Sequence, residues 1–409
     1  MRQEQSYSRF LFGSILALTI SCVLVIAFVI VVDPYRLFRL VEKTDFNQIK
    51  PAPERYQEEI KLSVAKAFGG NAIILGNSRA EIGFNPEYTD LPETGYVAFN
   101  LAIAGSTAAT AKRQYAYLQQ AGQHPKLIVL GVEFLDFLRK PTALDTIKLN
   151  SQAERSPDAW KWKFDTIFSI ASVADAIETL HIQHRPESIT MTAQGFNPLL
   201  EYRKYAREQG YYALFQQRAI ENAKKYLSKK GQSFDFAHAA DMRDVKSLLE
   251  SDFADNAEMH VIIYPYHAQI LAMFEQAGLW TAFETWKLQL AEQVAVVQKN
   301  YPNRRITLWD FSGYSRFQCE RIPAKNDKLA VTEWYWEAGH FKPSLGNKII
   351  ERLLKPERKF ADSSFGFSLN TGNGKENQQR IESERASCKA SYPALFDEVD
   401  RLMKNAGGS

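Results

Sequence analysis

The feature that most constrains this chain is an uncharged apolar run, Phe10–Val32, close to its N-terminus. At about 1.5 Å of rise per residue, a helix of this length crosses a hydrocarbon core of about 30 Å. A cleaved secretory signal would have a shorter apolar core followed by small residues at its cleavage site. The run instead ends in Ile-Val-Val-Asp-Pro-Tyr at 30–35, which offers no such site. We therefore expect an uncleaved, single-pass transmembrane anchor at residues 10–32.

The basic residues around this run do not decide its orientation. Arg2 and Arg9 precede it, whereas Arg36, Arg39 and Lys43 follow it, so the positive-inside rule favours neither side. A short N-terminal tail before a single anchor fits a tail inside the cell and a large domain outside. We expect the chain in the inner (cytoplasmic) membrane, with its main domain in the periplasm or another extracytoplasmic space.

Charge and motif content limit the partners and cofactors that the chain can have. The net charge is +3, from 50 Lys and Arg against 47 Asp and Glu, and the basic residues are scattered along the sequence. A nucleic-acid partner is therefore not expected. The sequence has no Cys-x-x-Cys or His-x-x-x-His spacing, so we expect no metal and no other cofactor.

Three cysteines bear on the redox compartment. Cys22 lies inside the apolar run, while Cys319 and Cys388 lie in the C-terminal part of the chain. In an oxidising compartment the latter two could pair, which requires Cα atoms about 4.4–6.8 Å apart. The sequence leaves open whether this disulfide forms.

Short apolar segments alternate with helix-prone stretches after the anchor. The apolar segments are Ala72–Leu75, Tyr96–Phe99, Leu127–Leu130, His260–Tyr264 and Ile306–Trp309, and two of the helical stretches are Thr107–Gln120 and Thr281–Lys299. This alternation is typical of an α/β fold whose parallel sheet is covered on both faces. We predict a doubly wound, five-stranded parallel sheet, in which ligands bind outside the carboxyl ends of the strands.

The chain divides into a tail (1–9), the anchor (10–32), a juxtamembrane linker with a helix at Glu54–Phe68 (33–70), a main domain (71–360) and a polar C-terminal extension (361–409). Between the third and fourth predicted strands, residues about 138–256 form an aromatic, helix-prone insertion. It either packs a small core of its own or caps the substrate cleft. The extension offers helix candidates at Gln378–Cys388 and Pro393–Lys404.

A candidate nucleophile follows the first predicted strand. Ser78 stands in Leu-Gly-Asn-Ser-Arg at 75–79, where Gly76 permits a tight turn. A serine hydroxyl needs a base to become nucleophilic, and backbone amides of the following turn can stabilise an oxyanion. Taken alone, a serine in this position is more often a helix N-cap.

A candidate base follows the last predicted strand. His340 comes three residues after Glu337, just before a helix expected at about 343–354. A carboxylate that accepts from one ring nitrogen fixes the tautomer and leaves the other nitrogen free to act as a base. Because the carboxyl ends of parallel strands share one edge, we expect Ser78 near His340. The alternative is a surface histidine that caps the last helix.

These blocks resemble those of the SGNH (GDSL-type) hydrolase superfamily. Residues 76–78 match the nucleophile block, and 100–105 match the block whose glycine, here Gly105, adds an amide to the oxyanion hole. Glu337–His340 stands in the place of the family's Asp-x-x-His. The chain is similar in particular to membrane-anchored bacterial members, such as alginate O-acetyltransferase-like proteins. The resemblance implies a Ser78 acyl-enzyme, with His340 as base and Glu337 orienting it.

Two departures from the family pattern concern the oxyanion hole. Asn77 replaces the usual Asp before the nucleophile, which leaves the serine chemistry intact. Glu133 lies near the position of the family's oxyanion Asn, and an ionised Glu would repel a developing oxyanion. Either Asn77 or Asn100 then contributes a side-chain amide, or the hole uses only the backbone amides of Ser78 and Gly105.

Other side chains near the predicted edge have two possible roles each. Arg79 either binds a carboxylate or a sugar hydroxyl of the substrate, or forms a salt bridge with Glu81 or Glu133. His267 follows the fourth strand and is either a structural residue or a substrate contact. Asp136 and Asp310 are interpreted as capping or loop residues.

Two functional classes remain open from the sequence. The first is a serine acyl-ester enzyme that takes an acyl donor and acts on a cell-envelope polysaccharide or a small ester, with water as acceptor in an esterase and a sugar hydroxyl in an O-acyltransferase. The second is a non-catalytic protein that binds glycan or acts as a scaffold with partner proteins of an envelope complex. Glu133 at an oxyanion position favours the second class.

Overall fold

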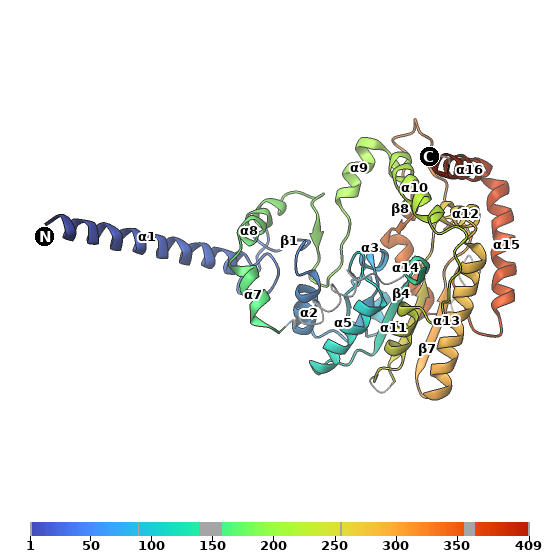
Figure 1. The fold of residues 1–409 in the computed structure, drawn as a ribbon, viewed down its shortest axis with the longest axis horizontal. Helices are drawn as coiled ribbons and strands as arrows, with labels where there is room; N and C mark the ends of the chain where they lie inside the picture. Colours follow the sequence, from blue (N-terminus) through green and yellow to red (C-terminus); the bar gives the residue numbers. More distant parts are fainter. Residues whose placement is uncertain (1, 89, 139–157, 254–255, 356–364, 408–409) are drawn as a thin grey trace.

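A computed structural model describes residues 2–88, 90–138, 158–253, 256–355 and 365–407 (Figure 1). Residues 139–157 of the predicted insertion and 361–364 of the predicted extension lie outside this description. The chain is a mixed α/β protein with a largely parallel central sheet and a long apolar helix at its N-terminus.

The helices are α1 (Arg2–Val32), α2 (Gln57–Phe68), α3 (Ser78–Gly83), α4 (Asp90–Glu93), α5 (Ala108–Gln120), η1 (Phe134–Leu138), α7 (Trp160–Ile167), α8 (Ile170–Ile182), α9 (Glu201–Gln209), α10 (Tyr211–Leu227), α11 (Ala240–Leu249), α12 (Ala268–Gln276), α13 (Trp280–Asn300), α14 (Pro343–Leu354), α15 (Gly374–Ser391) and α16 (Pro393–Gly407). The strands are β1 (Lys50–Pro51), β2 (Ala72–Leu75), β3 (Ala98–Asn100), β4 (Leu127–Val132), β5 (Thr190–Met191), β6 (Glu258–Ile263), β7 (Arg305–Asp310), β8 (Tyr335–Glu337), β9 (His340–Phe341) and β10 (Phe367–Ser368).

Within the described residues, the central sheet has six strands in the order β10-β7-β6-β4-β2-β3. The strands β3, β2, β4, β6 and β7 pair in parallel and correspond to the five segments predicted from the sequence. The predicted number of strands was wrong, because β10 pairs antiparallel with β7 and places Phe367 opposite Asp310. A two-residue strand has no apolar run of its own, so only the folded chain reveals it.

The middle of the sheet is buried because its strands are continuous apolar runs. Every residue of β2 and β4 is buried, as expected for strands covered on both faces. Gly131 in β4 lets the Tyr264 ring pass closely, since a Cβ at this position would lie 2.1 Å from the tyrosine hydroxyl. The Tyr264 hydroxyl thereby reaches the turn that follows β2.

Helix α1 projects from the rest of the chain (Figure 1). In the described part of the chain, its segment Tyr7–Val32 is the helix long and apolar enough to cross a membrane. Its last turn is anchored in the protein, where Val29 and Val32 pack against Ala176 of α8. The Lys50 ammonium donates to the Val32 carbonyl at 2.8 Å, which satisfies a carbonyl that the helix end leaves unpaired.

Most of the described insertion packs into the main core, whereas α8 forms a small separate cluster with the end of α1. Helix α10 packs against α12 and α16, and its buried residues, such as Phe215 and Tyr226, belong to the main apolar core. Helices α7 and α8 contact the end of α1, and β5 pairs with β1 of the juxtamembrane segment. One face of α10 also lines the candidate site, so the insertion contributes both to packing and to the cleft.

The C-terminal extension is tied to the main domain by a disulfide. Cys319 and Cys388 are bonded, with their Cα atoms 5.9 Å apart. Helices α15 and α16 contain both predicted helices and extend beyond them, and α16 packs on α10 and α12. Asp310, the buried last residue of β7, accepts hydrogen bonds from Ser312 at 2.8 Å and from Asn377 of α15 at 2.7 Å. It is a buried tether rather than only a loop residue.

Candidate functional site

Ser78 is the first residue of α3, directly after the turn that leaves β2. The N-cap of this helix is Asn77, whose side-chain oxygen accepts from the Arg79 amide at 3.1 Å. The alternative role of Ser78 as an N-cap is therefore wrong. Its hydroxyl is instead 2.9 Å from Nε2 of His340. The structure brings the predicted nucleophile and base together.

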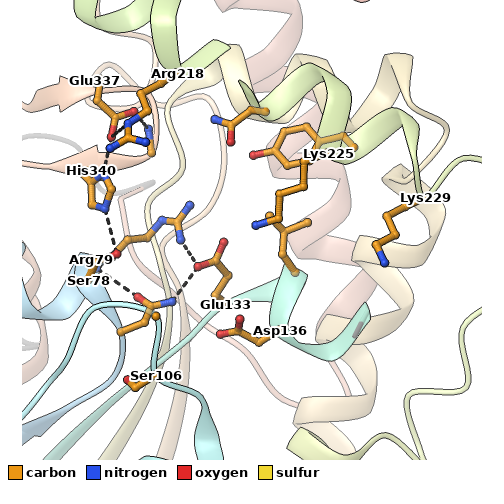
Figure 2. A pocket seen from close by; sticks show the side chains of 16 residues that line it. Ser78, Arg79, Ser106, Glu133, Asp136, Arg218, Lys225, Lys229, Glu337 and His340 are labelled. Carbon is orange, nitrogen blue, oxygen red and sulfur yellow. Dashed lines mark hydrogen bonds and ion pairs between the residues drawn. The ribbon is translucent and has the colours of Figure 1, made fainter. Parts of the chain in front are cut away.

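The β8–β9 hairpin presents His340 to Ser78. Glu337 ends β8 and His340 begins β9, and the Nδ1 of His340 is hydrogen-bonded to Oε1 of Glu337 (Figure 2). Oε2 of Glu337 accepts from the Gly339 amide at 2.7 Å. Both carboxylate oxygens therefore have a donor, and the donor at Oε1 fixes Nε2 as the unprotonated nitrogen that faces Ser78.

Glu337 is buried, with 1% of its surface exposed, yet it is held in its charged form. Burial by itself would raise the pKa of this carboxyl, but its interactions with His340, with the Gly339 amide and with Arg218 together lower the pKa below its ordinary value. The Arg218 side chain adds a cation 4.0 Å away. A buried, ionised carboxylate is the group that stabilises an imidazolium at His340.

A half-buried carboxylate, that of Glu320, holds the hairpin in position. Glu320 accepts from the backbone amides of Glu333, Trp334 and Tyr335, the last at 3.1 Å. These amides lead directly into β8. Glu320 follows Cys319 in the chain, so the disulfide, this carboxylate and the hairpin form one connected unit. No sequence pattern points to Glu320, since its acceptor role depends on a loop that returns from thirteen residues further along.

The loop after β3 supplies the candidate oxyanion donor. Gly105 lines the cavity beside Ser78, and its φ of +71° is a conformation that favours glycine. Among the described residues, neither the Ser78 amide nor the Gly105 amide donates to a protein acceptor. Since both residues line the same cavity, two backbone donors are available to it, as an oxyanion hole requires.

This loop is braced by a buried ion pair that sequence reasoning missed. Glu81 accepts from the Ala104 amide at 3.0 Å and pairs with the Lys61 ammonium at 3.0 Å. Lys61 also donates to the Ala102 carbonyl. Since Lys61 comes from α2 and Glu81 from α3, the pair joins the juxtamembrane helix to the segment that carries Gly105.

Glu133 forms an ion pair with one neighbour and a hydrogen bond with another, so it does not face the cavity as an isolated charge. Its Oε2 accepts from the Asn77 side-chain amide at 2.7 Å and from the Arg79 guanidinium (Figure 2). Burial alone would lower the pKa of Arg79, but the surrounding charges, of which Glu133 is the strongest, together raise this pKa above its ordinary value. Of the two roles predicted for Arg79, the structure forms the salt bridge with Glu133.

Two predicted side-chain donors to the oxyanion, Asn77 and Asn100, are engaged in other hydrogen bonds. The Asn77 amide is already bonded to Glu133. Asn100 is fully buried, and its amide donates to the carbonyls of Ala80 and Phe84 at 2.9 Å each while its oxygen accepts from Ala102. The prediction of Asn100 as an oxyanion donor is therefore wrong, because it closes the end of α3.

His267 is also structural. Its ring accepts from the Gln269 amide at 3.1 Å as the N-cap of α12, and its Nε2 donates to the Glu320 carbonyl at 2.9 Å. Burial lowers the pKa of His267 to about 4, so the ring is neutral at pH 7. The predicted substrate contact is wrong, because the side chain is fully buried away from the cavity.

The Ser78 hydroxyl opens into a cavity of about 560 Å³. Its far wall is formed by α10, which contributes Arg218 beside Glu337 and Lys225 across from Glu133, and by Lys229 in the turn that follows the helix (Figure 2). Tyr226 of the same helix lines the cavity as well, and among the described residues its buried hydroxyl has no hydrogen-bond partner. Sequence reasoning missed this wall, although Arg218 and Lys225 are seven residues apart and so lie on one face of the helix.

The site thus combines a serine hydroxyl, a histidine with an unprotonated nitrogen, a buried carboxylate and two free backbone amides, the groups that nucleophilic acyl chemistry uses. In the described ranges, no group of three or more His, Cys, Asp or Glu side chains is placed to hold a metal ion. Comparison of the chain with protein-family models, curated proteins and solved structures finds no match.

Proposed function

We propose that this chain is a membrane-anchored serine acyl-ester enzyme of the SGNH kind. The observation that carries the proposal is the continuous hydrogen-bonded series from Glu337 through His340 to the Ser78 hydroxyl, with Nε2 and Oγ 2.9 Å apart. The order of the parallel strands supports the fold assignment. From β2 the chain passes first to β3 on one side and then to β4 on the other side of β2, as in doubly wound flavodoxin-like sheets. Ser78 directly follows β2 and so lies at this switch point.

In the proposed first half-reaction, Ser78 Oγ attacks the carbonyl carbon of an acyl donor while His340 Nε2 takes the hydroxyl proton. The amides of Ser78 and Gly105 bind the resulting oxyanion. The tetrahedral intermediate then expels the donor's alkoxide, which takes the proton from His340, and an ester between the acyl group and Ser78 remains. Glu337 holds the Nδ1 proton and stabilises the transient imidazolium.

In the second half-reaction, His340 removes a proton from the acceptor hydroxyl, whose oxygen attacks the acyl carbon. The tetrahedral intermediate then expels Ser78 Oγ, which takes the proton back from His340. Water as acceptor makes the enzyme an esterase, and a sugar hydroxyl makes it an O-acyltransferase. The cavity of about 560 Å³ is large enough for part of a sugar chain as well as an acyl group.

The surroundings of the site support a substrate in the cell envelope. Helix α1 fits a membrane anchor, and the Cys319–Cys388 disulfide fits an oxidising compartment, which favours an extracytoplasmic domain. Lys225 and Lys229 have no ion-pair partner among the described residues, so the α10 wall favours a donor or acceptor that carries carboxylate or phosphate. Together these features support a cell-envelope polysaccharide as the acceptor.

A non-catalytic glycan-binding or scaffold role is the competing proposal, and Glu133 is the residue that favours it. A free carboxylate beside the oxyanion site would oppose acyl transfer. However, Glu133 is bonded to the Arg79 guanidinium and the Asn77 amide, so most of its charge is compensated before an oxyanion forms. This pairing supports the enzyme over the scaffold.

A fluorophosphonate probe separates the two proposals, since it phosphonylates only an activated serine. The full-length wild-type protein in detergent is expected to be labelled, and labelling is lost in Ser78→Ala and strongly reduced in His340→Ala. Ser387→Ala, which removes an exposed hydroxyl on α15, serves as control and retains labelling. A folded wild-type protein that neither reacts with the probe nor hydrolyses an acetyl ester would favour the scaffold.

A further inference from the structure

Large apolar side chains are exposed on the two helices next to the end of α1. These side chains belong to Trp160, Phe164 and Phe168 around α7 and to Ile170 and Ile177 of α8, and we call them the α7–α8 patch. The aromatic rings follow one helical face, with centroids 5.8 Å apart for Trp160 and Phe164 and 4.2 Å apart for Phe164 and Phe168. A group of exposed large apolar side chains of this kind marks a site of contact with another protein or with a membrane.

The patch lies where α1 enters the rest of the protein. Helices α7 and α8 both contact α1, and Figure 1 shows them at the end of the molecule from which α1 projects. The contact is made by the last turn of the candidate span, where Val29 and Val32 pack against Ala176. Val32 ends the candidate span and so lies at the boundary between the hydrocarbon and the headgroups. A headgroup layer is about 5–8 Å thick and a helix about 10–12 Å wide. Helices that touch this end of the span therefore lie at the level of the headgroups.

The junction between α1 and the protein is held by several hydrogen bonds, so the patch has a defined height relative to the span. Besides Lys50, the Asn47 amide donates to the carbonyl of Val32 at 3.1 Å. The Asp33 carboxylate accepts from the amides of Leu37 and Arg39, each at 2.7 Å, and folds the chain back directly after the helix. A helix joined in this way cannot swing freely on a flexible linker.

We propose that the α7–α8 patch rests in the headgroup region of the same bilayer that α1 crosses, and this proposal rests on α1 being a membrane anchor. Tryptophan and other aromatic side chains are enriched at this depth, and Lys161 and Lys163 beside Trp160 suit anionic headgroups. Two contacts with the bilayer, the span and the patch, fix the tilt of the domain. They also fix the distance between the membrane and the Ser78 cavity, which decides the substrates that can reach it.

Lipid quenching of a fluorescent label tests the proposal in the full-length protein. In a Cys22→Ser background, single cysteines replace Ile170, which is 90% exposed, or Leu329, which is 92% exposed and lies on the loop that contacts the α9–α10 turn. Each variant carries an environment-sensitive fluorophore and is inserted into phosphatidylethanolamine–phosphatidylglycerol vesicles. The vesicles contain a phospholipid with a nitroxide near the headgroup end of its acyl chain.

The label at Ile170→Cys is expected to lose most of its emission in nitroxide vesicles, whereas the label at Leu329→Cys keeps its emission. Equal emission from the two positions overturns the proposal, as does a label at Ile170→Cys that is shielded from water but not quenched by lipid, which would point to a protein partner on the patch. A label on the native Cys22, which lies near the middle of the span, tests the anchor itself in vesicles whose nitroxide is near the methyl end of the acyl chain. Its quenching without quenching at Ile170→Cys refutes the patch alone, while no quenching at Cys22 removes the anchor and the patch together.

Discussion

Replacing Glu337 with glutamine probes the proposed mechanism most informatively, because the substitution preserves shape and removes one charge. In the wild type, Oε1 accepts from His340 Nδ1–H and Oε2 accepts from the Gly339 amide. A glutamine has only one oxygen. If that oxygen stays on Gly339, its NH2 group faces Nδ1, and the ring must then carry its proton on Nε2. His340 would then donate toward Ser78 and could not take the serine proton.

The size of the effect follows from this change of tautomer and from the lost carboxylate charge. Loss of the corresponding carboxylate in a Ser-His-Asp site lowers turnover by about 10⁴-fold, which corresponds to about 5 kcal/mol of transition-state stabilisation at about 1.4 kcal/mol per decade. We expect a drop of similar order in kcat/KM for an acetyl ester, with a smaller change in KM.

The assay compares steady-state acetyl-ester turnover and the rate of fluorophosphonate labelling in wild type, Glu337→Gln and Glu337→Asp. The aspartate variant keeps the charge on a shorter arm and is expected to retain more activity than the glutamine variant. Thermal unfolding shows that each variant is folded. A folded Glu337→Gln that keeps activity within tenfold of wild type would refute the assigned role of Glu337.

Three further predictions concern the surroundings of the site. The folded-state pKa of His267, about 4, lies below its unfolded value of about 6.5, so its neutral ring stabilises the fold above pH 6.5. This contribution, about 3 kcal/mol, is lost as the pH falls toward 4. The free energy of unfolding, measured with denaturant, should therefore depend less steeply on pH in His267→Asn than in the wild type. The control His124→Asn, at an exposed site, should show the wild-type dependence. Arg79→Gln leaves the Glu133 carboxylate buried without its cation and should cost about 3–5 kcal/mol of unfolding free energy, more than the double variant Arg79→Gln/Glu133→Gln; a double variant less stable than the single one contradicts this account. The double variant Lys225→Ala/Lys229→Ala should raise KM for a carboxylate-bearing ester about tenfold without changing KM for a neutral ester. The control Lys224→Ala/Lys230→Ala changes residues outside the cavity wall and should change neither KM. Equal effects of the two double variants would exclude a specific role for the wall.

The parts of the fold that the sequence predicted are those determined by local pattern. The segment at Ala72–Leu75 is apolar without interruption because β2 lies inside the sheet, and its bounds match the prediction. The Ser78–His340 pair was predictable because parallel strands bring their carboxyl ends to one edge. Strand β10 was not predictable, since Phe367 and Ser368 become a strand only by pairing with β7.

The roles of individual polar residues depended on three-dimensional contacts that no spacing reveals. Asn100 fits the family's second block, yet its side chain closes α3 because the carbonyls of Ala80 and Phe84 happen to end beside it. Lys61 and Glu81 would ordinarily be placed on the surface, but both are buried as an ion pair beneath the Gly105 loop. The α10 wall likewise joins the site only because the insertion folds back over the sheet edge.

The central claim is that Ser78 carries the acyl group between two half-reactions. The most direct test is intact-protein and peptide mass spectrometry of the full-length protein, quenched with acid during incubation with an activated acetyl ester. The account predicts one added acetyl group on the peptide that contains Ser78, absent in Ser78→Ala. An acetyl group on another residue of the active protein, or turnover by Ser78→Ala at the wild-type rate, would contradict it.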